Sequence, residues 1–127
     1  MSKTKVTNIS MVNALDTLAV LAGTRLPVKI SYAVKKNVEI ISRELKPYEE
    51  ERTALINKHG DKDEEGNVKT EGDKYFIADV EGFNKEIVEL NEIESEVEFY
   101  NISLDDLLNS NAELSTRELT SIEFLLK

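Results

Sequence analysis

The chain has 127 residues, of which 40% are hydrophobic and 32% charged, contains no cysteine, and carries a formal net charge of −9. This length predicts one folded domain, and the lack of cysteine excludes disulfides, thiolate nucleophiles and cysteine-ligated zinc. The acidic charge disfavours nucleic acid as a partner. The sequence has no apolar N-terminal run and no stretch of about 18 consecutive apolar residues. We therefore expect a cytoplasmic protein without membrane contact.

Two helices are predicted in the first 60 residues. The first covers residues 8–22, where apolar positions repeat at steps of three and four and Gly23 follows as a C-terminal glycine. The second runs from about residue 28 or 31 to 59. Pro47 lies inside it and predicts a kink, because proline lacks the N–H for a helical bond and crowds the preceding turn. A helical hairpin with a long kinked second helix is therefore favoured over two separate helices in this span.

The second helix has an apolar seam at alternating steps of four and three, which is the heptad spacing of helices that pack along their length. The seam consists of Val34, Val38, Ile41, Leu45, Tyr48 and Leu55, interrupted by Arg52. Packing against the first helix covers part of it. The remainder requires the C-terminal helices, the same seam of a second subunit in a homodimer, or a different protein partner.

Residues 61–102 predict a β-hairpin, a helix and an acidic strand. The strand at 74–80 pairs with residues 68–70 around the turn "EGDK", and an amphipathic helix follows at 81–91. The next segment alternates apolar and acidic residues with a period of two, which is typical of a strand with one wet face. The acidic face of this strand consists of Glu92, Glu94, Glu96 and Glu98. It is either a solvated surface or a functional one, which holds a cation or mimics the phosphates of DNA.

Two short helices are predicted in residues 103–127. The first begins at Ser103, and the second at Ser115, where Glu118 completes a capping box. The fold class is therefore α+β: a helical hairpin, a small antiparallel sheet and short C-terminal helices. We expect one domain over residues 1–127, in three segments at 1–60, 61–102 and 103–127.

The loop "HGDKDEEGNVKTEGDKYFI" partly matches an EF-hand calcium site. Asp61, Asp63 and Glu65 occupy its first three ligand positions, and a glycine follows where the loop turns. The final position holds Gly72 in place of the bidentate glutamate, and a strand follows in place of a helix. The alternatives are a weak calcium-binding module and a solvated hairpin loop.

The sequence predicts no catalytic residue and no cofactor. His59 is the only histidine and lies at a predicted helix end, where it is expected to act as a helix charge or a partly buried residue. No phosphate-binding glycine loop, nucleophile elbow or zinc-protease motif is present. We therefore expect a protein that is not an enzyme.

Five segments in order resemble a family of small uncharacterised proteins from phages and prophages of Gram-positive bacteria. These are "LPVKISYAVKKN", "PYEEERTALINKHG", "GFNKEIVEL", "ISLDDL" and "LSTRELTSIEFLL", which together span nearly the whole chain. The resemblance implies a phage setting and a role in the cytoplasm of the host cell, and it transfers no catalytic residue. The expected function is a non-catalytic protein that binds a virion assembly partner or a host factor. A calcium module and an acidic DNA-mimic inhibitor of a host protein are the alternatives.

Overall fold

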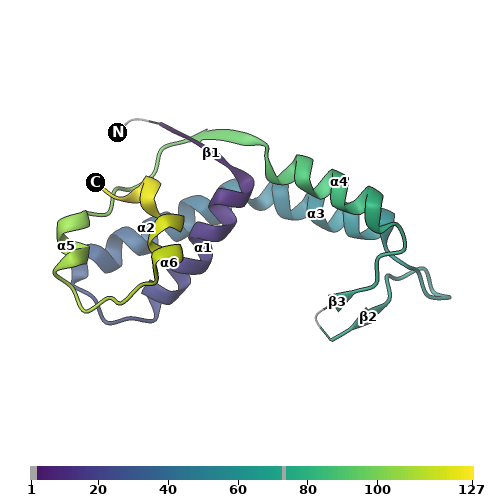
Figure 1. Cartoon of the computed structure of the whole chain (residues 1–127), viewed down its shortest axis with the longest axis horizontal. Coiled ribbons are helices and arrows are strands. Elements are labelled where there is room, and N and C mark those ends of the chain that lie inside the picture. Colours follow the sequence, from purple (N-terminus) through teal and green to yellow (C-terminus); the bar gives the residue numbers. More distant parts are fainter. Residues whose placement is uncertain (1–2, 73) are drawn as a thin grey trace. The chain divides into compact units, whose positions relative to one another are not determined.

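The computed structural model describes residues 3–72 and 74–127 and has an α+β fold, which confirms the predicted class. The chain divides into two compact units (Figure 1). The terminal unit contains the described chain up to Leu45 together with Glu94–Lys127, and the central unit contains Lys46–Ile93. This division differs from the three consecutive segments expected from the sequence, because residues from both ends of the chain share one core.

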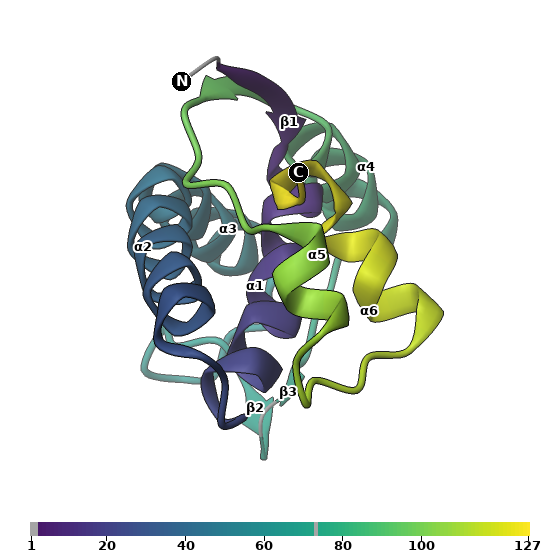
Figure 2. The ribbon, with the colours of Figure 1, turned by 90° about the vertical axis from the view of Figure 1, so that its left-hand side faces the viewer.

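The terminal unit is built on a helical hairpin, as predicted. Its central helix α1 packs against α2 and against α6, which follows about 100 residues later (Figure 2). The elements of this unit are β1 (Thr4–Thr7), α1 (Asn8–Ala22), α2 (Val28–Glu44), β4 (Glu94–Val97), α5 (Leu104–Leu108), α6 (Thr116–Ser121) and the 3₁₀ helix η1 (Glu123–Leu125). The two predicted serine caps are confirmed, including the capping box of Ser115 and Glu118 on α6.

Strand β1 pairs antiparallel with β4, an arrangement that the sequence analysis did not predict. Val6 and Val97 are buried, and Lys5 lies opposite Glu96 in the register. Threonine and valine in "TKVT" are good strand formers, but the four-residue segment acquires a partner only from a position 90 residues later. The strand therefore depends on the fold of the whole terminal unit.

The core of the terminal unit is apolar except for a few polar side chains that have partners. Asn37 is fully buried and exchanges two hydrogen bonds with the backbone of Tyr100. The hydroxyls of Thr17 and Ser121 lie 2.6 Å apart between α1 and α6. The apolar core residues include Met11, Ala14, Leu18, Leu21, Ile30, Ala33, Val34, Ile41, Ile102, Ile122 and Leu125.

The central unit contains the helices α3 and α4 and a short hairpin. Helix α2 ends at Glu44, Leu45 is its C-cap, and α3 begins at Lys46. The expectation of one continuous helix with a kink at Pro47 is therefore wrong, because the structure has two helices there. The Tyr48 hydroxyl donates to Asn91 Oδ1 at 2.7 Å and joins the start of α3 to the end of α4. The elements are α3 (Lys46–His59), β2 (Thr70–Glu71), β3 (Lys74–Tyr75) and α4 (Val80–Asn91).

Every helix within residues 3–72 and 74–127 is too short or too polar to span a bilayer.

Candidate functional site

A pocket of about 310 Å³ opens on the central unit and combines apolar walls with two cations. Ile56 is 6% exposed and forms the buried part of its lining, while Tyr75 is 50% exposed. Among the residues that the structure describes, no carboxylate belongs to the lining, although the unit as a whole contains twice as many acidic as basic residues. The lining residues are Arg52, Ile56, Lys74, Tyr75, Ile77 and Phe83, and we call this the aromatic pocket.

Three segments position the aromatic pocket through simple helical and strand periodicity. Arg52 and Ile56 are four residues apart on α3, so they share one face of that helix. Tyr75 and Ile77 are two residues apart in an extended segment and therefore point to the same side. Phe83 comes from the first turns of α4, which packs against α3. Phe76, between Tyr75 and Ile77, is 46% exposed and lies outside the lining.

The hairpin that carries Tyr75 is short but well connected through its backbone. Thr70 pairs with Tyr75, as predicted, and Gly72 takes a positive φ of 62° that suits glycine. Asp73 of the predicted "EGDK" turn lies outside the described residues. The Phe76 N–H donates to the Lys69 carbonyl, and the Phe76 carbonyl accepts from the Asp61 N–H. These bonds hold the aromatic residues while leaving their side chains half exposed.

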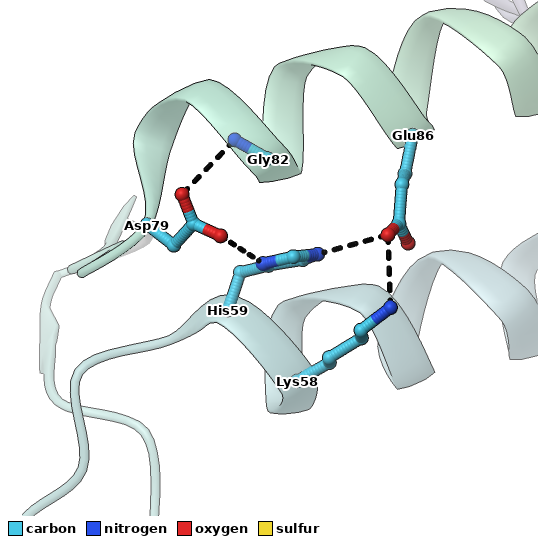
Figure 3. A network of polar contacts seen from close by, with 5 residues as sticks. All are labelled: Lys58, His59, Asp79, Gly82 and Glu86. Atoms are coloured by element: carbon cyan, nitrogen blue, oxygen red, sulfur yellow. Dashed lines mark hydrogen bonds and ion pairs between the residues drawn. The ribbon is translucent and has the colours of Figure 1, made fainter.

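A polar network behind the aromatic pocket fastens the end of α3 to the start of α4 (Figure 3). His59 is the last residue of α3 and is 8% exposed, and its Nδ1–H donates to Asp79 Oδ2 at 3.0 Å. The other side of the ring faces Glu86, whose Oε1 lies 3.5 Å from Nε2 and accepts from Lys58 Nζ at 2.8 Å. We call the residues Lys58, His59, Asp79 and Glu86 the histidine latch.

Asp79 has a second role as the N-cap of α4. Its Oδ1 accepts from the Gly82 N–H at 3.0 Å, and this bond holds the pKa of Asp79 below its usual value, with His59 acting in the same direction. A Cβ on residue 82 would collide with the Asp79 carboxylate, so any larger residue there must displace that carboxylate from its hydrogen bonds. The hydrogen bond between Lys58 and Glu86 lowers the pKa of Glu86 and raises that of Lys58.

The histidine latch supports the wall of the aromatic pocket. The rings of His59 and Phe83 meet edge to face, with centroids 6.3 Å apart. The carbonyl of His59 accepts from the N–H groups of Ala78 and Asp79, which follow the pocket residue Ile77. Asp79 therefore fixes the imidazole, and the imidazole fixes two segments that line the pocket.

The latch lacks the partner that a histidine-activated nucleophile requires. In a nucleophilic triad, the second imidazole nitrogen faces a hydroxyl or thiol, whereas His59 Nε2 faces a carboxylate and has no hydrogen-bond partner among the described residues. The central unit contains neither serine nor cysteine. Carboxylates from α4 and its N-cap face both ring nitrogens, so the arrangement suits holding two helices together.

The structure does not bring the candidate calcium ligands together. Asp63 Oδ1 accepts from the N–H groups of Glu65 and Asn67, which closes a turn of the loop, and Asp61 lies 3.6 Å from Lys69 Nζ. Within the described residues, no group of three or more His, Asp or Glu side chains has a geometry that could hold a metal ion. Asp61 and Asp63 instead organise the hairpin loop, to which Glu65 contributes its backbone N–H.

The apolar seam is not the continuous surface that the heptad spacing predicted. It is divided between α2 and α3 in different units, because the helix is interrupted at Leu45. Val34, Ile41, Leu45 and Tyr48 are buried inside the chain, and Val38 and Leu55 are half-buried. The expectation of one long interaction seam is therefore wrong. Val34 and Val38 line a groove of about 400 Å³ beside Leu21 in the terminal unit.

The predicted row of four glutamates on one strand is also wrong. Glu92 is the C-cap of α4, and only Glu94 and Glu96 lie in β4, where Lys5 is opposite Glu96. Glu98 follows the strand and is exposed. The period-two pattern was correct for the buried Val97 and Phe99, but the regular strand is shorter than the pattern.

Sequence reasoning did not identify the aromatic pocket, and two signals could have indicated it. Arg52 was noted only as an interruption of the seam, and "YFI" only as a strand. Three large apolar residues in succession cannot all face the inside of a two-stranded hairpin, so exposure of an aromatic side chain was foreseeable. The contribution of Phe83 depends on the packing of α4 on α3 and has no local signal.

Comparisons of the chain with protein-family models, with curated proteins and with solved structures find no match in any of the three. The resemblance to the phage family therefore stays a prediction.

Proposed function

We propose that the chain is a non-catalytic phage or prophage protein that binds another protein through the aromatic pocket. The partner is a virion assembly component or a host factor, and the site of action is the cytoplasm of the host cell. The single observation that carries the proposal is the half-exposed Tyr75 beside Arg52 over an apolar lining.

The composition of the aromatic pocket supports protein binding. Tyrosine and arginine are enriched among the residues that dominate binding energy at protein interfaces, and such residues sit in apolar pockets shielded from water. An aromatic side chain that is half exposed still has a large apolar area to bury against a partner. Phe76 adds a second half-exposed ring on the same short segment.

Two further features support a binding role over catalysis. The His59 ring of the histidine latch is buried and has carboxylates on both sides, so the latch is suited to fixing the pocket wall. Its acidic groups have lowered pKa values, which favours charged, acceptor-only carboxylates at neutral pH over a proton donor. The resemblance to phage proteins without assigned activity supports the same reading.

Site-specific photocrosslinking tests the proposal. A benzoylphenylalanine in place of Tyr75 is compared with one in place of Tyr32, because both tyrosines are 50% exposed and Tyr32 lies in the terminal unit. The protein is produced in a Gram-positive host during phage growth and irradiated. We expect a discrete crosslinked species at position 75 that is absent at position 32.

The mass of the crosslinked species identifies the partner, and twice the chain mass indicates a homodimer. Size-exclusion chromatography with light scattering at two salt concentrations then measures that self-association. The proposal fails when position 75 gives no crosslink, or when positions 75 and 32 give the same set of products.

A further inference from the structure

We infer that the aromatic pocket accepts an acidic peptide segment, in which an apolar side chain enters the pocket and a neighbouring carboxylate meets Arg52 and Lys74. This inference rests on the proposed function and specifies the chemistry of the partner. The observation behind it is that the described lining has two cations and no carboxylate.

The two cations at the aromatic pocket differ from Lys58 and Lys69 of the same unit, which have carboxylate partners. Lys58 has Glu86 as its partner, and Lys69 lies within 3.6 Å of Asp61. Arg52 and Lys74 form no ion pair with any residue that the structure describes, although the central unit has fourteen acidic and seven basic residues. In such an acidic unit, two cations at one pocket that have no carboxylate partner among the described residues are available to bind an anion.

The size of the aromatic pocket limits what enters it. Its volume of about 310 Å³ is near the lower end of the range for small-molecule sites, about 300 to 1,000 Å³. This space suits one large apolar side chain placed between Ile56, Ile77 and Phe83. Tyr75 at the rim offers a flat face and a hydroxyl to the neighbouring part of the same ligand.

A peptide fits these features better than a nucleic acid does. Nucleic acids require a stripe of cations along several phosphates, and a chain with a net charge of −9 repels such a polyanion at long range. One carboxylate beside one apolar side chain requires only the two cations present. An arginine can bind a carboxylate with two parallel hydrogen bonds, which fixes the orientation of the peptide.

Three tripeptide amides provide the test, because they share a central phenylalanine and carry flanking side chains that are negative, neutral or positive. They are acetyl-Glu-Phe-Glu, acetyl-Gln-Phe-Gln and acetyl-Lys-Phe-Lys, each titrated into the full chain up to about 10 mM, a range suited to weak millimolar binding. Amide chemical shifts of Ile56, Tyr75 and Phe83 report binding at the pocket. The variant Arg52→Gln/Lys74→Gln is compared with Lys46→Gln/Lys85→Gln, which removes the same charge from exposed positions outside the lining.

We expect the Glu peptide to shift the three amides and to bind roughly tenfold more tightly than the Gln peptide, the usual effect of a charge-assisted hydrogen bond. The Arg52→Gln/Lys74→Gln variant is expected to lose this preference, while the Lys46→Gln/Lys85→Gln variant keeps it. The inference is overturned when the Gln or Lys peptide binds as tightly as the Glu peptide, when both double variants weaken binding equally, or when no peptide binds. A specific crosslink at position 75 would then still support protein binding through contacts other than charge.

Discussion

Asn37 and Tyr100 form a closed pair of hydrogen bonds, 63 positions apart in the chain. The Asn37 amide group donates to the Tyr100 carbonyl at 2.6 Å, and its Oδ1 accepts from the Tyr100 N–H at 2.9 Å. The side chain of a fully buried residue thus completes the backbone bonding of the segment between β4 and α5. A carboxamide is the group that supplies one donor and one acceptor in this position.

The Asn37→Asp and Asn37→Ala variants are expected to destabilise the terminal unit. Alanine leaves two buried backbone groups without partners, at about 1–3 kcal/mol each, and aspartate keeps the acceptor but loses the donor and buries a charge. Urea unfolding measures the loss. Asn13→Ala, at an exposed position of α1, serves as the control and should change the free energy of unfolding by less than about 0.5 kcal/mol. Equal effects of the Asn37 and Asn13 variants would contradict the role of the pair.

Gly82→Ala tests the contact between α4 and the histidine latch. In an exposed helix, this change usually stabilises by about 0.5–1 kcal/mol, because alanine loses less backbone freedom on folding. Here the new Cβ displaces the Asp79 carboxylate, so the N-cap and the His59 bond are lost and the variant should be less stable. In an Asp79→Ala background the obstruction is absent, and the same change should be stabilising. A double-mutant cycle by thermal unfolding measures this reversal of sign, and additive effects would contradict it.

Acid should weaken the central unit through Asp79 and Glu86. Both groups have a pKa in the folded chain below the usual values of 3.8 and 4.5, so the unfolded chain takes up protons first as the pH falls. Their contribution is fully present above about pH 4.5 and is lost as the pH drops through the folded-state pKa values. Unfolding free energies between pH 3 and pH 7 should therefore decline more steeply for the wild type than for Asp79→Asn/Glu86→Gln. Parallel profiles would be inconsistent with the latch.

The loop at residues 61–67 should respond to the removal of a hydrogen-bond acceptor and not to calcium. Asp63→Asn retains an oxygen for the N–H groups of Glu65 and Asn67, whereas Asp63→Ala removes it. Amide hydrogen exchange at these two residues should speed up in the alanine variant only.

Calorimetry with calcium at about 1 mM should show no heat in the wild type, because a site without a bidentate ligand binds weakly. A calcium heat that Asp63→Asn abolishes would restore the metal hypothesis.

Local signals predicted the elements whose causes lie within a few residues. Pro47 indicated the disturbance near Leu45, Ser115 and Glu118 indicated the start of α6, and the "EGDK" turn indicated the hairpin. Each of these follows from backbone sterics or from a cap within one helical turn. The same locality explains why the position of helix α4 was correct to within one residue at its start.

The features that sequence reasoning missed depend on contacts between distant segments. The β1–β4 pairing joins Thr4 to Val97, and the heptad spacing of the seam gave no indication that α2 and α3 belong to different units. His59 was correctly expected at a helix end, but its partner Asp79 is 20 residues away and becomes a neighbour only when α4 packs on α3. Periodicity identifies which face of an element is apolar, and it does not identify the element that covers that face.

The division of the terminal unit between the two ends of the chain has a consequence for synthesis on the ribosome. Residues up to Leu45 emerge first but lack β4, α5 and α6, which come from Glu94–Lys127. Lys46–Ile93 is contiguous, so all its folding partners are available once that stretch has left the exit tunnel. The later-starting unit is therefore expected to fold first, and the hairpin of α1 and α2 keeps its apolar side uncovered until Glu94–Lys127 has also left the tunnel.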